Sequence, residues 1–348
     1  MSPYVTPLLL MGMFLGTTAT IISSHWLLAW MGLELSTIAI IPLMSRQHHP
    51  RAVEATTKYF LIQATAAALL LFASVTNAWL SGEWYIQQMS HPLPTVVITL
   101  ALALKVGVAP LHAWLPEVLQ GLDLTTGLIL STWQKIAPLT LIIQIQPQNP
   151  TLMITLGLLS TLVGGWGGLN QTQVRKILAY SSIAHLGWMI LVIQFMPSLT
   201  ILNVLTYFIM TISTFTIFKF LSSTNISTLA NSWSKAPVLT ALAPLTLLSL
   251  GGLPPLTGFA PKWLILQELT KQDLIIAALI AALSALLSLY FYLRLTYAMA
   301  LTISPNVTLT SAPWRLHYAR AELPLSLSTT CAILLLPLMP TALAMLTN

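Results

Sequence analysis

Charged side chains are scarce in this 348-residue chain: Asp, Glu, Lys and Arg together make up only 6% of it. A soluble domain has about 25% charged residues, because water has to solvate its surface. With 56% hydrophobic residues and a mean hydropathy of +0.82, the chain cannot cover a water-facing surface of its size. Lipid must therefore surround most of the chain, which makes it an integral membrane protein.

Cysteine is nearly absent as well, since Cys331 is the one cysteine. A single cysteine forms neither an internal disulfide nor a Cys-rich metal site. The N-terminus lacks both the basic segment of a secretory signal and an amphipathic Arg- and Ser-rich presequence. We therefore expect the chain to insert through its own first helix or to be made in the compartment where it works.

Apolar windows of about 20 residues, the length that a spanning helix needs, recur along the chain. They predict eleven spans, near residues 3–22, 26–44, 59–80, 94–115, 124–146, 151–169, 177–195, 199–220, 236–268, 274–303 and 323–346. The longest loop, 304–322, is too short for a soluble domain. We expect an all-α, polytopic membrane helix bundle of about 11 transmembrane helices.

Two of these spans are interrupted. The first, 94–115, contains Gly107 and Pro110, and the second, 236–268, contains the run GGLPPLTG. We read the second as one span with a broken middle, and two short re-entrant pieces are the alternative. Transporters built from internal repeats place their sites at discontinuous helices. We therefore predict inverted-repeat halves near 94–220 and 236–303 within a single transmembrane domain, 1–348; prolines with only a packing role are the alternative.

The basic residues divide unequally between the two sides of the membrane. With eleven spans, the only basic loop residue on the side opposite the N-terminus is Lys271. The N-terminal side receives Arg46, Arg51, Lys58, Arg175, Lys176, Lys219, Lys235, Arg315 and Arg320. Basic loops stay on the cytoplasmic or matrix side, so the N-terminus is expected there and the C-terminus opposite. The net charge of +6 is explained in this way, and no nucleic-acid partner is expected.

Once the loop residues and those at span ends are set aside, five charged residues remain inside the predicted spans: Glu34, Lys105, Lys135, Lys262 and Arg294. A charge near the bilayer centre costs about 2.5–3.5 kcal/mol on insertion scales, so such residues face a bundle interior and pair with one another. Arg294 lies far enough along its span to reach the basic interface, where it would act as an anchor. The other four lie near mid-span.

One carboxylate and three amines on separate helices suit few kinds of site. A metal would need clustered carboxylates or histidines, a haem would need facing axial histidines, and no G-x-S-x-G nucleophile motif occurs. Burial and a neighbouring carboxylate act in opposite directions on how firmly an amine holds its proton. A line of such groups, bridged by water, can relay protons. The alternative is a set of fixed ion pairs that specify helix packing, but three lysines against one acid would leave positive charge uncompensated.

Two histidines lie well inside the spans. His112 follows Lys105 by two helical turns, which would place both on one face, and it is either a relay group or a satisfied buried imidazole. His185 could pass a proton between Lys135 and the matrix side, or it could join helices together with the serines beside it.

Three runs carry a resemblance to a known family: APLHAWLPEVLQG (109–121), GGWGGLNQTQVRKILAYSSIAHLGWM (164–189) and SLGGLPPLTGFAPKW (249–263). They resemble the proton-translocating, antiporter-like family shared by respiratory complex I and the multisubunit cation/proton antiporters. The first 60 residues, with SSHWLLAWMGLE and HHPRAVEATTKYF, resemble its animal mitochondrial branch. The likeness covers nearly the whole chain and is least distinctive near 300–323.

The resemblance implies roles for particular residues. Glu34 would pair with Lys105 on the first broken helix, Lys135 would be a central lysine, and Lys262 would lie on the second broken helix. The chain would be encoded in mitochondria and lie in the mitochondrial inner membrane, with its N-terminus in the matrix and its C-terminus in the intermembrane space.

The resemblance also implies partners. NADH, FMN, iron–sulfur clusters and ubiquinone would be bound by other subunits, so no cofactor and no metal is expected in this chain. Its partners would be the other membrane-arm subunits of complex I, further antiporter-like subunits among them, and membrane lipid, with cardiolipin a candidate.

The function expected is therefore that of a proton-translocating membrane-arm subunit of an NADH:ubiquinone oxidoreductase, with a buried Glu/Lys relay. A self-contained cation/proton antiporter is the alternative. An antiporter for Na⁺ should have a carboxylate-rich site, and this chain has one intramembrane acid. A purely structural scaffold, which would tolerate loss of all four charges, is a third possibility.

Overall fold

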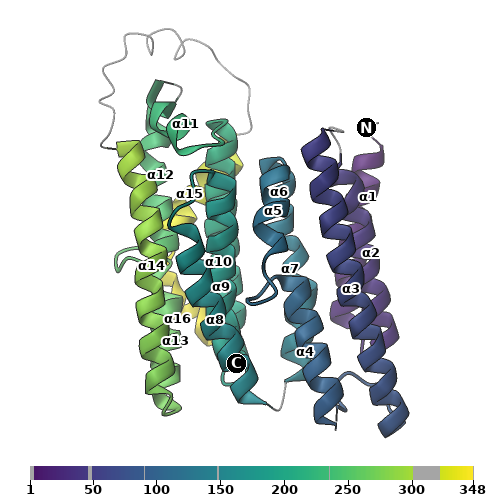
Figure 1. Cartoon of the computed structure of the whole chain (residues 1–348). Coiled ribbons are helices and arrows are strands. Elements are labelled where there is room, and N and C mark those ends of the chain that lie inside the picture. Colours follow the sequence, from purple (N-terminus) through teal and green to yellow (C-terminus); the bar gives the residue numbers. More distant parts are fainter. Residues whose placement is uncertain are drawn as a thin grey trace. The chain divides into compact units, whose positions relative to one another are not determined.

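The computed structural model describes residues 4–45, 49–89, 91–146, 149–234, 236–300 and 322–347, and these contain helices but no β-strand (Figure 1). The chain divides into two compact units, Met1–Leu159 and Ser160–Asn348. Of the basic loop residues expected on one side, Arg46, Lys235, Arg315 and Arg320 lie outside the described residues.

The first unit consists of three long helices followed by two interrupted ones. Their bounds are α1 Val5–Ile22, α2 Trp26–Met44, α3 Pro50–Ser81, α4 Pro92–Val106, α5 Trp114–Gly121, α6 Leu124–Ser131 and α7 Trp133–Ile145, and α8 Pro150–Gly168 crosses the boundary to the second unit. α3 begins at Pro50, well before the predicted start at 59, because His49 caps it by accepting the N–H of Arg51. Arg51 and Lys58 are therefore helical and do not lie in a loop.

The second unit continues with the other helices. Their bounds are α9 Val174–Val192, α10 Pro197–Phe220, α11 Ile226–Ala230, α12 Pro237–Gly251, α13 Phe259–Lys271, α14 Ile275–Ala300, α15 Glu322–Leu334 and α16 Met339–Thr347, with short 3₁₀ turns at Asn231–Ser234 and Leu336–Leu338.

Each of the eleven predicted spans is occupied by helix within the described residues. Seven are long and apolar enough to cross a membrane, and the bent pair α15 and α16 makes an eighth. The other three are α9 and the two broken pairs, α4 with α5 and α12 with α13. The 67° bend between α15 and α16 was not expected, and Pro337 and Pro340 explain it because a proline lacks the N–H that continues a helix.

The two broken pairs share one local design. Each first helix begins with a proline, Pro92 or Pro237, and ends before a glycine with a left-handed backbone, Gly107 (φ 87°) or Gly252 (φ 82°). Glycine is the residue that adopts this conformation without a steric cost, and it is the usual end of a helix. The spacing between the two pairs is a constant 145 residues (92 to 237, 107 to 252), and the second helices, at Trp114 and Phe259, keep it.

The order of elements also repeats. Residues 5–145 contain three helices (α1 to α3), then the broken pair of α4 and α5, then a further spanning segment (α6 with α7). Residues 150–300 contain the same order: α8 to α10, the broken pair of α12 and α13, and α14, with the short α11 added before the pair. The predicted halves, 94–220 and 236–303, stay a prediction, and so does the inverted relation between them.

In the first unit, α1 and α2 approach closely through glycine. A Cβ added at Gly16 would lie 2.7 Å from the carbonyl oxygen of Gly32, and one added at Gly32 would lie 2.8 Å from that of Gly16. Small residues allow membrane helices to pack backbone against backbone, since hydrophobicity does not drive helices together in lipid. This contact sets the position of α2, which carries Glu34.

Candidate functional site

The two buried lysines of the first unit line one cavity. Lys105 lies in the last turn of α4 and Lys135 in the first turn of α7, and their side chains are 5% and 3% exposed. The space open to the centre of a water molecule is about 10 Å³, on the order of what one buried water requires. The structure therefore brings together two amines from different helices around a space of that size.

Lys135, like Lys105, lies beside an interruption of its helix. The span 124–146 is broken at Thr132, between α6 and α7, where the backbone has φ −113° and ψ −72°. Pro138, in the next turn, has no N–H to donate to the carbonyl of Gln134. The prediction of two interrupted spans missed this third break, and the proline three residues after Lys135 was the signal for it.

The cavity wall is polar at several points that the sequence reasoning missed. Ser36 and Thr37 of α2, Tyr59 and Gln63 of α3, and Gln134 of α7 all line it. The Gln134 side chain donates to the carbonyl of Ser36 at 3.4 Å. The prediction considered charged residues only and therefore did not include these neutral ones. A glutamine inside an apolar run is nevertheless a signal of a buried polar site.

The amine of Lys105 has no hydrogen-bond partner within the part of the chain that the structure describes. Buried polar atoms are almost always hydrogen-bonded, to protein or to water. A buried amine that no protein group binds suits a group that exchanges its proton with water.

Glu34 lies apart from this cavity. Its side chain lines an open, mostly apolar groove between α1 and α2, with Trp30 and Leu35 among the neighbours. The ion pairs found within 4.0 Å among the described residues do not include Glu34 with Lys105, so the predicted pairing is not formed here. The two are close enough for electrostatic attraction, and the hydroxyl of Thr37, which lines the cavity, lies 3.3 Å from Oε2 of Glu34. Thr37 thus connects the carboxylate to the cavity wall.

Lys262 lies in α13 of the second unit and reaches back to the break before it. Its Nζ donates to the carbonyls of Leu250 at 3.3 Å and Gly251 at 2.7 Å. These are the last carbonyls of α12, which lack partners within the helix and carry the negative end of its dipole. The ammonium of Lys262 therefore caps α12.

The predicted helical face shared by Lys105 and His112 is wrong. α4 ends at Val106, and His112 lies in the turn between α4 and α5. Its Nδ1 is 3.2 Å from the carbonyl oxygen of Pro110, and the imidazole is half-buried. The left-handed Gly107 turns the chain away, which removes the helical spacing on which the prediction rested. A relay role for His112 stays a hypothesis.

His185 lies in α9 of the second unit and is 5% exposed. Its ring centroid is 5.3 Å from that of Tyr207 in α10. The hydroxyls of Ser181 and Ser182 donate to carbonyls of their own helix, and Ser182 is also hydrogen-bonded to the side chain of Tyr207, which connects α9 to α10. The predicted role of His185 stays open between relay and packing.

Arg294 lies in α14, and its Nη1 donates to the carbonyl of Leu169, just after α8, at 2.6 Å. This bond binds the arginine to a helix end in its own unit. Its predicted role as an interfacial anchor is not tested.

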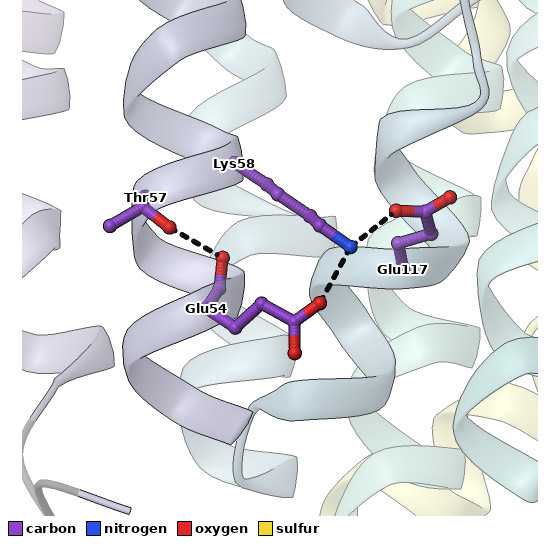
Figure 2. A network of polar contacts seen from close by, with 4 residues as sticks. All are labelled: Glu54, Thr57, Lys58 and Glu117. Carbon is purple, nitrogen blue, oxygen red and sulfur yellow. Dashed lines mark hydrogen bonds and ion pairs between the residues drawn. The ribbon is translucent and has the colours of Figure 1, made fainter. Parts of the chain in front are cut away.

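A charged network lies at the start of α3 (Figure 2). The Nζ of Lys58 is 2.8 Å from Oε1 of Glu54 and 2.9 Å from Oε2 of Glu117 in α5. All three side chains are exposed, so water screens the pairs and each is worth little. The network connects α3 to α5, the second helix of the first broken pair.

Among the described residues, no group of three or more His, Cys, Asp or Glu side chains is placed to hold a metal ion. The polar side chains that line the cavity carry amines, amides and hydroxyls.

A membrane bundle of discontinuous helices with lysines beside the breaks defines the class of proton- or ion-translocating membrane proteins. The family described as NADH:quinone oxidoreductase/Mrp antiporter matches residues 23–288, and the family described as NADH dehydrogenase subunit 2 C-terminus matches residues 289–343. The chain belongs to the NADH:quinone oxidoreductase/Mrp antiporter family, which confirms the resemblance seen in the sequence.

Relatives match nearly the whole length of the chain. NADH-ubiquinone oxidoreductase chain 2 of Tetraodon nigroviridis is 68% identical over 340 residues, covering 98% of both chains. The protein of the same name from Oncorhynchus mykiss is 66% identical over 347 residues, covering 99% of both.

Solved structures share the fold. A chain of respiratory complex I from Thermus thermophilus, with bound aureothin, superposes with a TM-score of 0.88 at 27% identity, over 99% of this chain and 80% of that one. A chain of the Mrp complex from Dietzia sp. has a TM-score of 0.80 at 19% identity, over 98% and 78%. The predicted fold, an antiporter-like helix bundle, is confirmed.

Proposed function

We propose that the chain is a proton-translocating membrane-arm subunit of respiratory NADH:ubiquinone oxidoreductase, in the position of chain 2. Relatives with the name of that chain match it over nearly its whole length. The single observation that carries the proton-handling role is the cavity of the first unit, where Lys105 and Lys135 from two different helices face the same space.

The geometry supports a short proton-transfer step within the first unit. A protonated amine on one side of the cavity can give its proton to a water there, and the neutral amine on the other side can take it up. The hydroxyls of Tyr59 and Thr37 and the amides of Gln63 and Gln134 can orient such a water. Glu34 acts through Thr37: when the carboxylate moves closer, it favours the protonated amine, and when it moves away, it releases the proton.

Lys262, His112 and His185 are proposed as further proton carriers. Lys262 is the strongest of the three, because its amine already contacts the break between α12 and α13. Redox chemistry is proposed to lie elsewhere: NADH, FMN, iron–sulfur clusters and ubiquinone would be bound by other subunits, and this chain would hold none.

The proposed location is the mitochondrial inner membrane, as a multi-pass protein with the N-terminus in the matrix and the C-terminus in the intermembrane space. The uneven distribution of basic residues supports this orientation. Further antiporter-like subunits and membrane lipid, cardiolipin among it, are the proposed partners.

A self-contained cation/proton antiporter is the second candidate, because the fold also matches a chain of an Mrp complex. One experiment separates the two. Inner membranes are solubilised in mild detergent and run on a native gel, which is stained for NADH oxidation, and the active band is analysed by mass spectrometry. Finding the chain in a megadalton NADH-oxidising assembly supports the first candidate. Migration alone or as a small oligomer would replace it with the second.

A further inference from the structure

The helices before the two breaks end in the same way. In each, the carbonyl four residues before the left-handed glycine accepts the N–H of that glycine and of the next residue, at 2.9 and 3.0 Å for Gly107 and at 3.0 and 3.4 Å for Gly252. The two helix ends can be aligned by the constant spacing of 145 residues (107 to 252). In this alignment the carbonyl of Lys105 corresponds to the carbonyl of Leu250.

The groups that bind the next carbonyls differ in charge. The ammonium of Lys262 donates to Leu250 and Gly251 at the end of α12. At the end of α4, a neutral group takes the place of the ammonium at Leu250: the amide of Gln63 donates to the carbonyl of Lys105 at 3.2 Å. The indole of Trp114 donates to the carbonyl one residue earlier, that of Leu104, at 3.1 Å. The carbonyls at the end of α12 are thus bound by a cation, and those at the end of α4 by an amide and an indole.

This difference has an electrostatic consequence. The carbonyl end of a helix carries partial negative charge, and an ammonium is attracted to it. α12 holds Lys262 in this way. At α4 the carbonyls of Leu104 and Lys105 are occupied by neutral donors, and the amine of Lys105 has no hydrogen-bond partner among the described residues. Gln63 is 5% exposed, lines the cavity with both lysines and donates to the carbonyl of Lys105, so the amide and the two lysines surround the same space.

We propose that Gln63 is a positioning residue of the proton relay: by occupying the carbonyl of Lys105, it keeps an ammonium in the cavity from binding the end of α4, so that proton exchange continues there. The inference rests on the proposed function, in which Lys105 and Lys135 transfer protons. The titratable groups that neighbouring helices bring toward Lys105 are Glu34 of α2, Tyr59 of α3 and Lys135 of α7. Gln63 is neutral, so its replacement by an apolar residue changes none of their charges directly.

The test replaces Gln63 by methionine, which has similar length and no donor. The matched control is Gln144→Met: the Gln144 amide donates to the carbonyl of Ile21 at the end of α1, at 3.1 Å, and no lysine lines the pocket in which Gln144 lies. Both variants therefore lose one bond from an amide to a helix end. NADH-driven quinone reduction and proton pumping are measured against pH in inner-membrane vesicles that contain the whole assembly.

Gln63→Met should shift the alkaline limb of the pH profile upward by about one pH unit. In this variant an ammonium of the cavity can bind the vacated carbonyl, and a hydrogen bond to a charged group stabilises the protonated form by at least the free energy of about one pH unit. Gln144→Met should leave the profile in place. If Gln63→Met does not assemble, Gln63→Asn, which keeps the amide but shortens its reach, is measured instead. If the pH profile of the Gln63 variant coincides with the pH profile of Gln144→Met, the inference is overturned.

A parallel variant, Lys105→Met, separates this inference from the proposed function. If pumping and coupled turnover survive in Lys105→Met, the relay itself is refuted. If they are lost there while the Gln63 variants keep the normal pH profile, only the positioning role of Gln63 is refuted.

Discussion

Gly252 offers the sharpest test of the capped break in the second unit. Its backbone has φ 82°, and a Cβ added to it would lie 2.9 Å from Cδ and 3.0 Å from Nζ of Lys262. Alanine at this position would therefore have two effects: it would strain the left-handed backbone and displace the amine from the carbonyls of Leu250 and Gly251.

A matched glycine separates these two effects. Gly82, which ends α3, has φ 74° and nothing within 4 Å of an added Cβ. Gly82→Ala should therefore cost only the left-handed backbone, about 1–2 kcal/mol. Gly252→Ala should cost this and a further amount of about 1.5–3 kcal/mol, the usual contribution of a hydrogen bond to a charged group. Since about 1 kcal/mol shifts the melting temperature of a 150–250-residue domain by 2–4 °C, the two variants should melt about 3–12 °C apart.

The assay is thermal unfolding of the solubilised assembly, together with coupled NADH:quinone turnover in vesicles. We expect Gly82→Ala to keep turnover near the unaltered level and Gly252→Ala to lower it, because the displaced Lys262 is a proposed proton carrier. Equal melting temperatures and equal turnover would refute the view that Lys262 stabilises the break as an ammonium cap.

Three further predictions follow from the structure of the first unit. Lys135→Ala should lower proton pumping and coupled turnover at least tenfold while the assembly persists on a native gel; normal pumping in an intact assembly would count heavily against a relay through Lys135. Gly16→Val should reduce the amount of assembled complex on the same gel, because the new side chain would overlap the Gly32 carbonyl at 2.7 Å, whereas Gly12→Ala, with its nearest neighbour at 3.4 Å, should assemble normally. Lys58→Met should leave the melting temperature within about 2 °C, because its two ion pairs are exposed; a larger fall would show that the network stabilises α5 on α3.

The membrane class followed from composition, and the positions of the spans followed from apolar windows along the chain. When 6% of the residues are charged, water cannot be the main solvent, and a span of about 20 residues leaves little freedom in where helices fall. The breaks at Gly107 and Gly252 were visible for a similar reason, since glycine and proline interrupt helices locally.

Sequence spacing failed where the chain left the helix. His112 was assigned to the face of Lys105 on the assumption that one helix continued, and the left-handed turn at Gly107 ended it. The break at Thr132 was missed because Pro138, which lies beyond it, is a common and ambiguous signal in membrane helices.

The sequence by itself determined that four charges, Glu34, Lys105, Lys135 and Lys262, lie within apolar spans, because the cost of placing a charge in lipid can be read from one chain position at a time. Only the tertiary structure decided that Lys105 and Lys135 line one cavity, that Glu34 lines a different groove, and that an amide closes one break while an ammonium closes the other. Those facts depend on distances of a few ångströms between residues far apart in the chain, and helical periodicity carries no information about them.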